Sequence, residues 1–183
     1  MIKAKKLNRR FRQHIEEQSV FFVATAVATG HINLSPKGMD TLRVLSDERI
    51  IWLNLTGIGN ETATHVQDDG RMTLMFCSFG EQRLTLRVFG TAKVVHPRDP
   101  DWDKLVAQFP DLPGCRQIFD LDIELIQTSC GSTVPHMELV DTRVEKEFLP
   151  YYETMDREEL ENYWRKYNAT SLDGLPTNIL EPS

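Results

Sequence analysis

Apolar residues in the first part of the chain recur at helical spacing and then change to a strand-like pattern. Leu7, Phe11 and Ile15 lie four residues apart, which predicts an amphipathic helix over residues 5–17. From Val20 onward the chain is rich in β-branched and aromatic residues, with turn residues between the runs. This pattern predicts strands over residues 20–28, 31–35, 41–45 and 50–55, with an exposed turn at residues 36–38.

The rest of the chain mixes helix and strand signals. A short helix is predicted from Asn60, which suits the N-cap, to about Gln67. Asp156 and Glu159 form a capping-box pattern, which predicts a helix over residues 156–168. Between them we expect strands over residues 72–78, 83–95 and 123–127, and helical spacing over residues 102–109.

Successive predicted strands are joined by short turns, which is typical of antiparallel sheets. The expected fold class is therefore mainly β with flanking helices, with the sheet closing into a small barrel. The 183 residues suit one domain over residues 1–183, with a barrel core over about 19–130 and a C-terminal helical extension over about 135–183. No run of about 18 apolar residues occurs, so we expect no membrane span and a cytoplasmic location.

The charge of the chain is uneven, and this changes the expected partners. Up to Arg98 there are 14 basic and 9 acidic residues, whereas beyond it there are 7 and 18, and the whole chain carries −6. A net acidic chain argues against nucleic acid as the partner, but its basic first half suits a small anion. The cysteines and histidines show no metal-site spacing, so no metal is expected.

Two short segments are candidates for an anion site. The first runs from Thr56 to Thr62, where a glycine-containing turn leads into a helix start with free backbone N–H groups. The second candidate is Lys37, a point charge at the end of a strand. A capped helix with a flexible entry and a solvated turn lysine are the alternatives, and neither segment alone decides between them.

These segments resemble a known family. HINLSPKGMDTLRVLSDERIIWLNLTGIGNETATHV and RLTLRVFGTAKVV are similar to FMN-binding split-barrel proteins related to pyridoxamine 5'-phosphate oxidase, over about residues 10–130. The similarity is greatest to the oxidase-like branch, through Asn33 to Gly38, Gly59 to Thr62 and Gln127 to Gly131. The C-terminal arginine- and tryptophan-bearing motif of true pyridoxamine 5'-phosphate oxidases is missing, which argues against the vitamin B6 reaction.

The resemblance implies an antiparallel split β-barrel, and a homodimer with FMN at the subunit interface and a small-molecule substrate. It implies that the phosphate lies near Lys37, Asn60, Glu61 and Thr62. It places the rest of the flavin near Asn33, Leu34, Ser35, Pro36, Asn54, Leu55, Thr56, Arg83, Leu84 and Thr85, with Arg87 as the alternative cation, and Ser129 and Cys130 near the partner's ring. Cys130 itself is expected to be a small buried residue rather than a redox thiol.

The expected function is that of an FMN-dependent oxidoreductase, with no catalytic residue identified. Flavin chemistry needs little more from a protein than binding, orientation and tuning of the ring. A non-catalytic flavin- or haem-binding sensor or storage protein is one alternative, because one fold hosts many functions. A deazaflavin-dependent reductase is the other.

Overall fold

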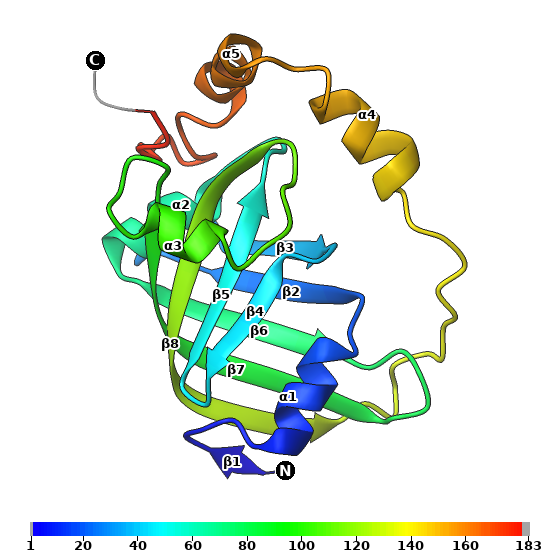
Figure 1. Cartoon of the computed structure of the whole chain (residues 1–183). Helices are drawn as coiled ribbons and strands as arrows, with labels where there is room; N and C mark the ends of the chain where they lie inside the picture. Colours follow the sequence, from blue (N-terminus) through cyan, green and yellow to red (C-terminus); the bar gives the residue numbers. More distant parts are fainter. Residues whose placement is uncertain (1, 181–183) are drawn as a thin grey trace.

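A computed structural model describes residues 2–180, and it consists of one strongly curled antiparallel sheet with helices around it (Figure 1). The strand order is β3-β2-β6-β7-β8-β5-β4, and β1 pairs with β8. The strands are β1 (Lys3–Ala4), β2 (Val20–Thr25), β3 (Asn33–Gly38), β4 (Leu42–Ser46), β5 (Arg49–Leu55), β6 (Arg71–Cys77), β7 (Leu84–Val95) and β8 (Cys115–Cys130). The molecule is thus the expected mainly β split barrel.

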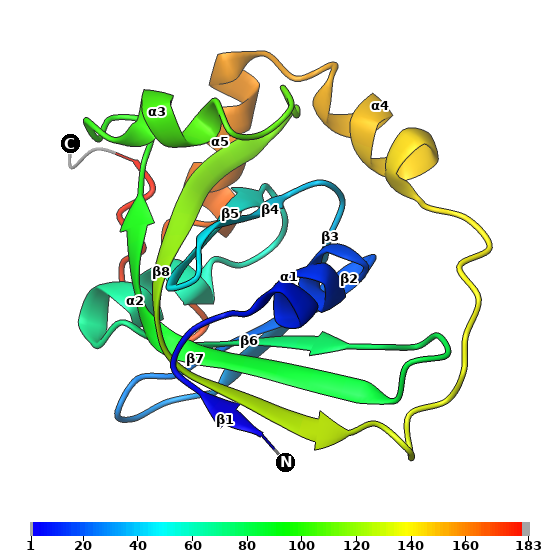
Figure 2. The same cartoon turned by 60° about the horizontal axis from the view of Figure 1, so that its bottom comes forward.

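The helices flank this sheet. They are α1 (Arg9–Glu16), α2 (Glu61–Asp68), α3 (Trp102–Val106), α4 (Leu149–Tyr152) and α5 (Arg157–Tyr167), with a π-helical turn η1 (Val144–Phe148) before α4. Figure 2 shows α1 at the mouth of the curled sheet and α3 beside β8. The predicted capping box at Asp156 is confirmed, with both of its reciprocal hydrogen bonds present.

Two strand predictions were wrong. Residues 36–38 are not an exposed turn, because β3 continues through Pro36 and Lys37 to Gly38. β3 lies at one edge of the sheet, where a residue without an N–H is tolerated. The last strand is sixteen residues long instead of five, because its first half carries polar residues whose burial is compensated by partners on other strands, as that of Asp120 is by Arg49.

Strand β5 connects two cores, as its unbroken run of apolar residues predicts. Ile50 and Trp52 belong to the main cluster inside the barrel, whereas Ile51 and Leu53 pack in a second cluster under α3. The Trp52 ring stacks on Phe119 at 4.6 Å between centroids. Both faces of β5 are therefore covered, and the Trp52 ring reaches the centre of the barrel.

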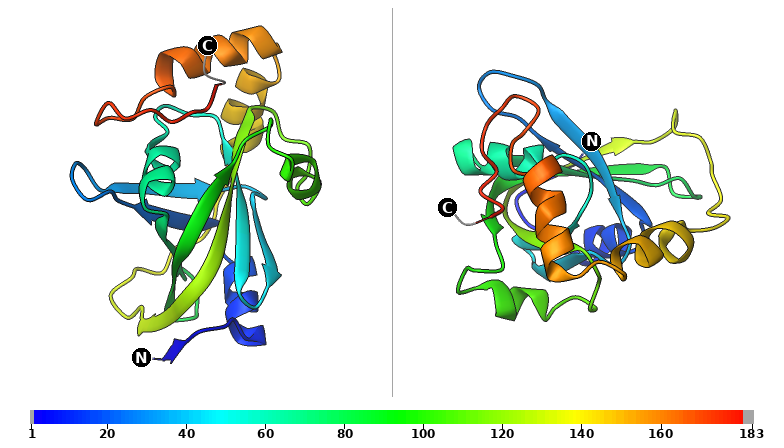
Figure 3. Two further views of the ribbon diagram at one scale, coloured as in Figure 1. Left: turned by 90° about the vertical axis from the view of Figure 1, so that its left-hand side faces the viewer. Right: turned by 90° about the horizontal axis from the view of Figure 1, so that it is seen from above.

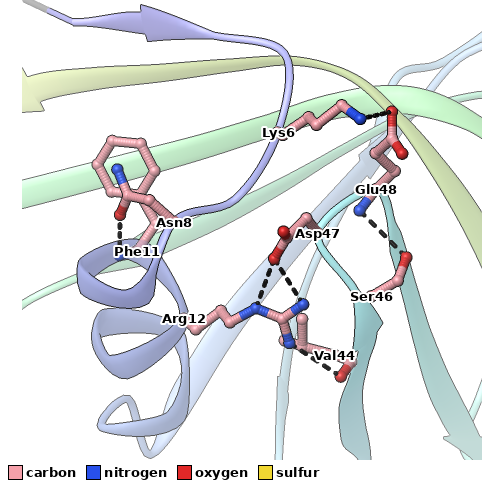
Figure 4. A network of polar contacts seen from close by, with 8 residues as sticks. All are labelled: Lys6, Asn8, Phe11, Arg12, Val44, Ser46, Asp47 and Glu48. Atoms are coloured by element: carbon pink, nitrogen blue, oxygen red, sulfur yellow. Dashed lines mark hydrogen bonds and ion pairs between the residues drawn. The ribbon is translucent and has the colours of Figure 1, made fainter.

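Helix α1 is fastened to the turn between β4 and β5 (Figure 4). Asn8 caps the helix by accepting a hydrogen bond from the Phe11 amide at 2.9 Å. Arg12 donates from Nε and Nη2 to Oδ1 of Asp47, at 2.9 and 2.7 Å. Lys6 pairs with Glu48 at 3.2 Å beside it. The helix start thus has both a cap and tertiary anchors, and it begins at Arg9, later than the apolar spacing alone indicates.

The C-terminal extension runs back to the barrel. Figure 3 shows α5 across one end of the sheet, with the chain after it passing α2. Thr64 donates to the carbonyl of Pro176 at 3.2 Å, and Gln67 donates to that of Thr177 at 3.0 Å. The last described residues are therefore tied to α2, a helix more than a hundred positions earlier.

Gly90 provides a test of the close packing between β7 and β8. It lies at the irregularity between β7 and β8, where a Cβ atom would collide with the backbone carbonyl of Asp122. We expect Gly90→Ala to lower the free energy of unfolding by about 2 kcal/mol or more, because a backbone atom cannot move aside as a side chain can. The matched control is Gly80→Ala, since a Cβ at Gly80 meets nothing within 4 Å. Equal unfolding midpoints in urea for the two variants would contradict this expectation.

Candidate functional site

The inner face of β3 carries three polar side chains into the barrel. Lys37 pairs with Phe21 and Ser35 pairs with Val23, and both partners are core residues. Directly opposite residues of an antiparallel pair point to the same side of the sheet, so Asn33, Ser35 and Lys37 face inward. Leu34 and Pro36 face outward, and both are exposed.

Lys37 is a positive charge without a counter-ion. Its Nζ lies 5.4 Å from the centroid of the Trp52 ring, and it forms no ion pair within residues 2–180. Burial, reinforced by the neighbouring Arg116 charge, lowers the pKa of Lys37 to about 8, although Glu61 opposes the shift. The sequence indicated the lysine but not its environment, because the turn expected around it is a strand.

Arg116 is a second buried cation, and sequence reasoning did not find it. Its side chain is 4% exposed and donates to the carbonyl of Gly59 at 2.9 Å. With its amide oxygen turned toward the guanidinium, Asn54 accepts from Nε at 3.1 Å. Burial lowers the pKa of Arg116 to about 10. The available signal was a charged residue two positions before the apolar pair Ile118 and Phe119, but the strand there was predicted too short.

Two buried polar atoms near these cations have no partner within the described residues. They are Oγ of Ser35 and Nδ2 of Asn60. Buried polar groups are normally hydrogen-bonded, so these unpartnered atoms call for a ligand or ordered water. The amide nitrogen of Asn60 is a donor and the serine hydroxyl can also donate, which suits an acceptor-rich anion.

The start of α2 lies beside the inner face of β3. Asn33 donates from Nδ2 to Oγ1 of Thr62 at 3.0 Å, which joins the strand to the helix. Asn60 is the N-cap residue of α2, as predicted, but its side chain makes no cap hydrogen bond. The buried amide of Asn60 lies 3.5 Å from that of Asn54 instead. Glu61 accepts from the Leu172 amide at 3.3 Å.

The C-terminal extension closes this site from outside. Trp164, 8% exposed, donates from its indole nitrogen to Oγ1 of Thr56 at 2.9 Å. Asn168 donates to the carbonyl of Gly57 at 2.8 Å. Asp173 accepts from the His31 amide at 2.9 Å, and this contact lowers the pKa of the Asp173 carboxyl. The loop before β3 and the turn before α2 are thus both held by the end of the chain.

The predicted site residues fall into two groups. Those on β3, near the end of β5 and at the start of α2 are joined by hydrogen bonds or lie beside Lys37; they are Asn33, Ser35, Lys37, Asn54, Asn60, Glu61 and Thr62. Leu55 ends β5 and Thr56 follows it, but the Thr56 hydroxyl is bonded to the carbonyl of Gly114 and the indole of Trp164. The others, Arg83, Leu84, Thr85, Ser129 and Cys130, pair where β7 begins and β8 ends. The cavities lined by Arg83 include neither Lys37 nor Arg116. The two groups of predicted residues therefore lie at separate places within one chain.

Cys130 differs from its expectation. It is exposed rather than buried, and its Sγ lies 2.5 Å from Oγ of Ser132. That hydrogen bond lowers the pKa of the thiol. Across residues 2–180, no three His, Cys, Asp or Glu side chains gather as a metal site. None of the helices in this range is long and apolar enough to cross a membrane.

Sequence and structure comparisons place this split barrel in a family. The sequence profile described as Pyridoxamine 5'-phosphate oxidase matches residues 7–130. The pyridoxamine 5'-phosphate oxidase family protein ustO of Aspergillus flavus is 36% identical over 188 residues, which cover 93% of this chain and 75% of ustO. The chain therefore belongs to the pyridoxamine 5'-phosphate oxidase family.

Solved structures show the same fold at lower identity. A Lactobacillus delbrueckii protein, described as a candidate pyridoxamine 5'-phosphate oxidase, is 22% identical with a TM-score of 0.57, covering 69% of this chain and 99% of that one. A variant of HupZ from Group A Streptococcus is 22% identical with a TM-score of 0.55, covering 67% and 98%. In both comparisons about a third of this chain has no counterpart.

The shifted pKa of Lys37 has a consequence for stability. Between pH 8 and 10.5 the unfolded chain keeps a proton on this amine that the folded chain has lost, so its contribution to stability rises with pH across that window. Below pH 8 the charged Lys37 amine lowers the free energy of unfolding by at most about 3 kcal/mol. We expect the ligand-free protein to gain stability against urea from pH 7.5 to 9.5 relative to Lys37→Met.

The control for this comparison is Lys104→Met, because Lys104 is exposed on α3. Its unfolding free energy should follow that of the unmodified chain at both pH values. If the unfolding free energy of Lys37→Met had the same pH dependence as that of the unmodified chain, the lowered pKa of Lys37 would be contradicted.

Proposed function

We propose that the protein is a homodimeric FMN-dependent oxidoreductase acting on a small organic substrate. The observation that carries the proposal is the pair of cations formed by the partly buried Lys37 and the buried Arg116. Neither forms an ion pair within residues 2–180, and Glu61 is the one carboxylate whose charge acts on both. A buried charge is costly unless it is paired, so a site of this kind is suited to an anionic ligand. The phosphate of FMN has the required charge.

The unpartnered polar atoms support the same ligand. Lys37, Ser35 and Asn60 would hold the phosphate, with Thr62 beside them at the start of α2 and its helix dipole. Arg116 would act mainly through its charge, because its hydrogen bonds go to the carbonyls of Gly57 and Gly59. Leu34 and Pro36 point away from the barrel, so their contribution would be the backbone of an edge strand.

The second group of predicted residues fits a homodimer. Ser129 and Cys130 end β8 far along the chain from the Lys37 site, so we assign them to the cofactor of the other subunit. Arg87 donates to Oγ of Ser129 at 3.0 Å, whereas Arg83 lines cavities beside α1. We therefore assign Arg87, rather than Arg83, to the flavin ring.

Bound FMN supplies hydride and electron transfer, and the chain supplies its position. β3 and α2 are joined by the Asn33 to Thr62 hydrogen bond, which keeps the phosphate-binding groups at a fixed spacing. The end of the chain, through Trp164 and Asn168, covers the turn before α2. Covering this turn limits water access to the buried cations and strengthens their attraction for an anion.

The test is FMN binding, measured by quenching of FMN fluorescence on titration with protein. We expect Lys37→Met to weaken FMN binding by about 10- to 100-fold, the loss typical of one charge-assisted hydrogen bond. Lys104→Met should bind FMN as the unmodified chain does. Riboflavin, which lacks the phosphate, should bind the unmodified chain and Lys37→Met with similar affinity.

The visible spectrum of the purified protein separates the alternatives. A flavin band, with FMN released on heating, supports the proposal, and reduction of that band by a substrate would add the oxidoreductase activity. A Soret band would instead indicate haem. Unmodified protein that remains colourless and leaves FMN fluorescence unquenched would refute FMN as the cofactor.

A further inference from the structure

A polar cavity lies where α1 packs against the turn between β6 and β7. Its volume is about 230 Å³, and its lining residues are Arg10, Gln13, His14, Gln82, Arg83 and Leu84. A second cavity of about 220 Å³ shares Arg10, Arg83 and Leu84 with it and extends to Ser129 and Cys130. Arg83 stands at the junction of the two cavities, and the proposed FMN phosphate site contributes to neither.

The two arginines of this cavity are uncompensated. Neither the Arg10 nor the Arg83 side chain makes an ion pair or a hydrogen bond with any other residue in the range 2–180. The neighbouring carboxylate, Glu17, is already occupied by two side-chain amides. It accepts from Gln13 at 2.7 Å and from Gln82 at 3.4 Å. A guanidinium is suited to planar recognition of carboxylate and phosphate groups.

His14 adds a buried polar atom at the wall of the cavity. It is 1% exposed, and its Nε2 lies 3.3 Å from the carbonyl oxygen of Phe76. A carbonyl only accepts, so Nε2 carries the proton and the neutral ring has its lone pair on Nδ1. Nδ1 is buried and makes no hydrogen bond of normal geometry with the described residues, although the Gln82 side chain lies close enough to raise the pKa of the ring. The ring is thus fixed through Nε2, and a ligand at Nδ1 would compete only with the exposed side chain of Gln82.

Helix α1 places Arg10 and His14 on a rigid element. The helix is capped by Asn8 and fixed to the β4–β5 turn through the paired contacts of Arg12 with Asp47 (Figure 4). Phe11 and Ile15 anchor the same helix in the barrel core. The spacing between His14 and Arg10, one helical turn, is therefore fixed before any ligand arrives.

We propose that this cavity binds a small organic anion through a carboxylate or phosphate group placed between Arg10 and Arg83, with Nδ1 of His14 as a third contact. The adjoining cavity reaches Ser129 and Cys130, which we assign to the cofactor of the other subunit, so the proposed ligand is confined to the cavity between α1 and the β6–β7 turn. All the lining residues of that cavity come from one chain, and none of them belongs to the Lys37 site. It gives an unassigned function to three residues that the proposed phosphate site does not use.

Binding would be coupled to a proton. An anion at Nδ1 favours the protonated ring, in which both nitrogens donate. Without ligand, burial lowers the pKa of His14, and the Arg10 charge lowers it further, whereas the Phe76 carbonyl, Gln82 and Glu17 oppose the shift. Arg83 lines the same cavity. A bound anion screens the Arg10 charge and itself favours the protonated ring, so the pKa of His14 should rise.

The experiment is histidine NMR on the full chain with inorganic phosphate as the probe. The protein is first saturated with FMN, which occupies the Lys37 site if the proposed function is right. The five histidine Hε1 signals are followed against pH with and without phosphate, and His14→Gln identifies the signal of His14. We expect phosphate to raise the pKa of His14 and to leave that of His31, which lines none of the cavities around Arg83, unchanged.

Matched arginine variants test whether Arg10 and Arg83 bind the phosphate. Arg10→Gln combined with Arg83→Gln should weaken phosphate binding at least tenfold and abolish the response of His14. Arg9→Gln, the exposed neighbour on α1 that lines neither cavity, should behave as the unmodified chain does. An unresponsive His14 in the unmodified chain, or an equal response in the double variant, would overturn the inference.

The Lys37→Met variant separates this inference from the proposed function. If Lys37→Met abolishes the phosphate response of His14, the anion belongs to the Lys37 site and the cavity proposal fails. If FMN does not bind but His14 still responds, the cavity proposal stands and the flavin assignment fails.

Discussion

The hydrogen-bonded ladder of β8 is the interaction on which the rest of the molecule depends. β8 pairs with β7 from Leu84 opposite Cys130 to Val95 opposite Ile118, and on its other side with β5 and β1. Because side chains alternate along a strand, a slip of one residue would remove Phe119 and Leu121 from the barrel interior. The core and both groups of polar residues therefore share a single register.

A register irregularity near the start of β8 places a buried positive charge beside the turn before α2. Arg116 lies at this irregularity, donates to the carbonyl of Gly59, and comes close to Lys37 of β3, although the two strands lie far apart in the sheet order. Burying two cations without a matching carboxylate costs stability, and natural proteins keep such arrangements where a ligand recovers the cost. The family profile ends with β8, yet the chain beyond it supplies Trp164 and Asn168 to the turn beside these charges.

The sequence predicted elements whose signals are local, and it failed where tertiary contacts decide. The helices at Arg9 and Arg157 follow from apolar spacing and caps, and both were found. Pro36 was interpreted as a strand breaker, because a sequence does not show that a strand lies at a sheet edge. The start of β8 was missed because its charged residues are compensated by strands far away in sequence, as Asp120 is by Arg49.

The candidate site shows the same division. Lys37 and the turn before α2 were identified from residue type and position, and the structure brings them together. Arg116 has no motif around it, and only the curl of the sheet shows that it belongs there. The separation of Arg83 from Lys37 could not be predicted either, since it depends on how far the barrel closes.

The position of Pro36 has a consequence for the behaviour of the protein at high concentration. β3 is an edge strand of the sheet, and an open edge invites pairing with strands of other molecules. Pro36 has no N–H to offer, and the edge is only six residues long. An incoming strand could therefore not form a continuous ladder, so the residue that ended the predicted strand also protects the folded chain from aggregation.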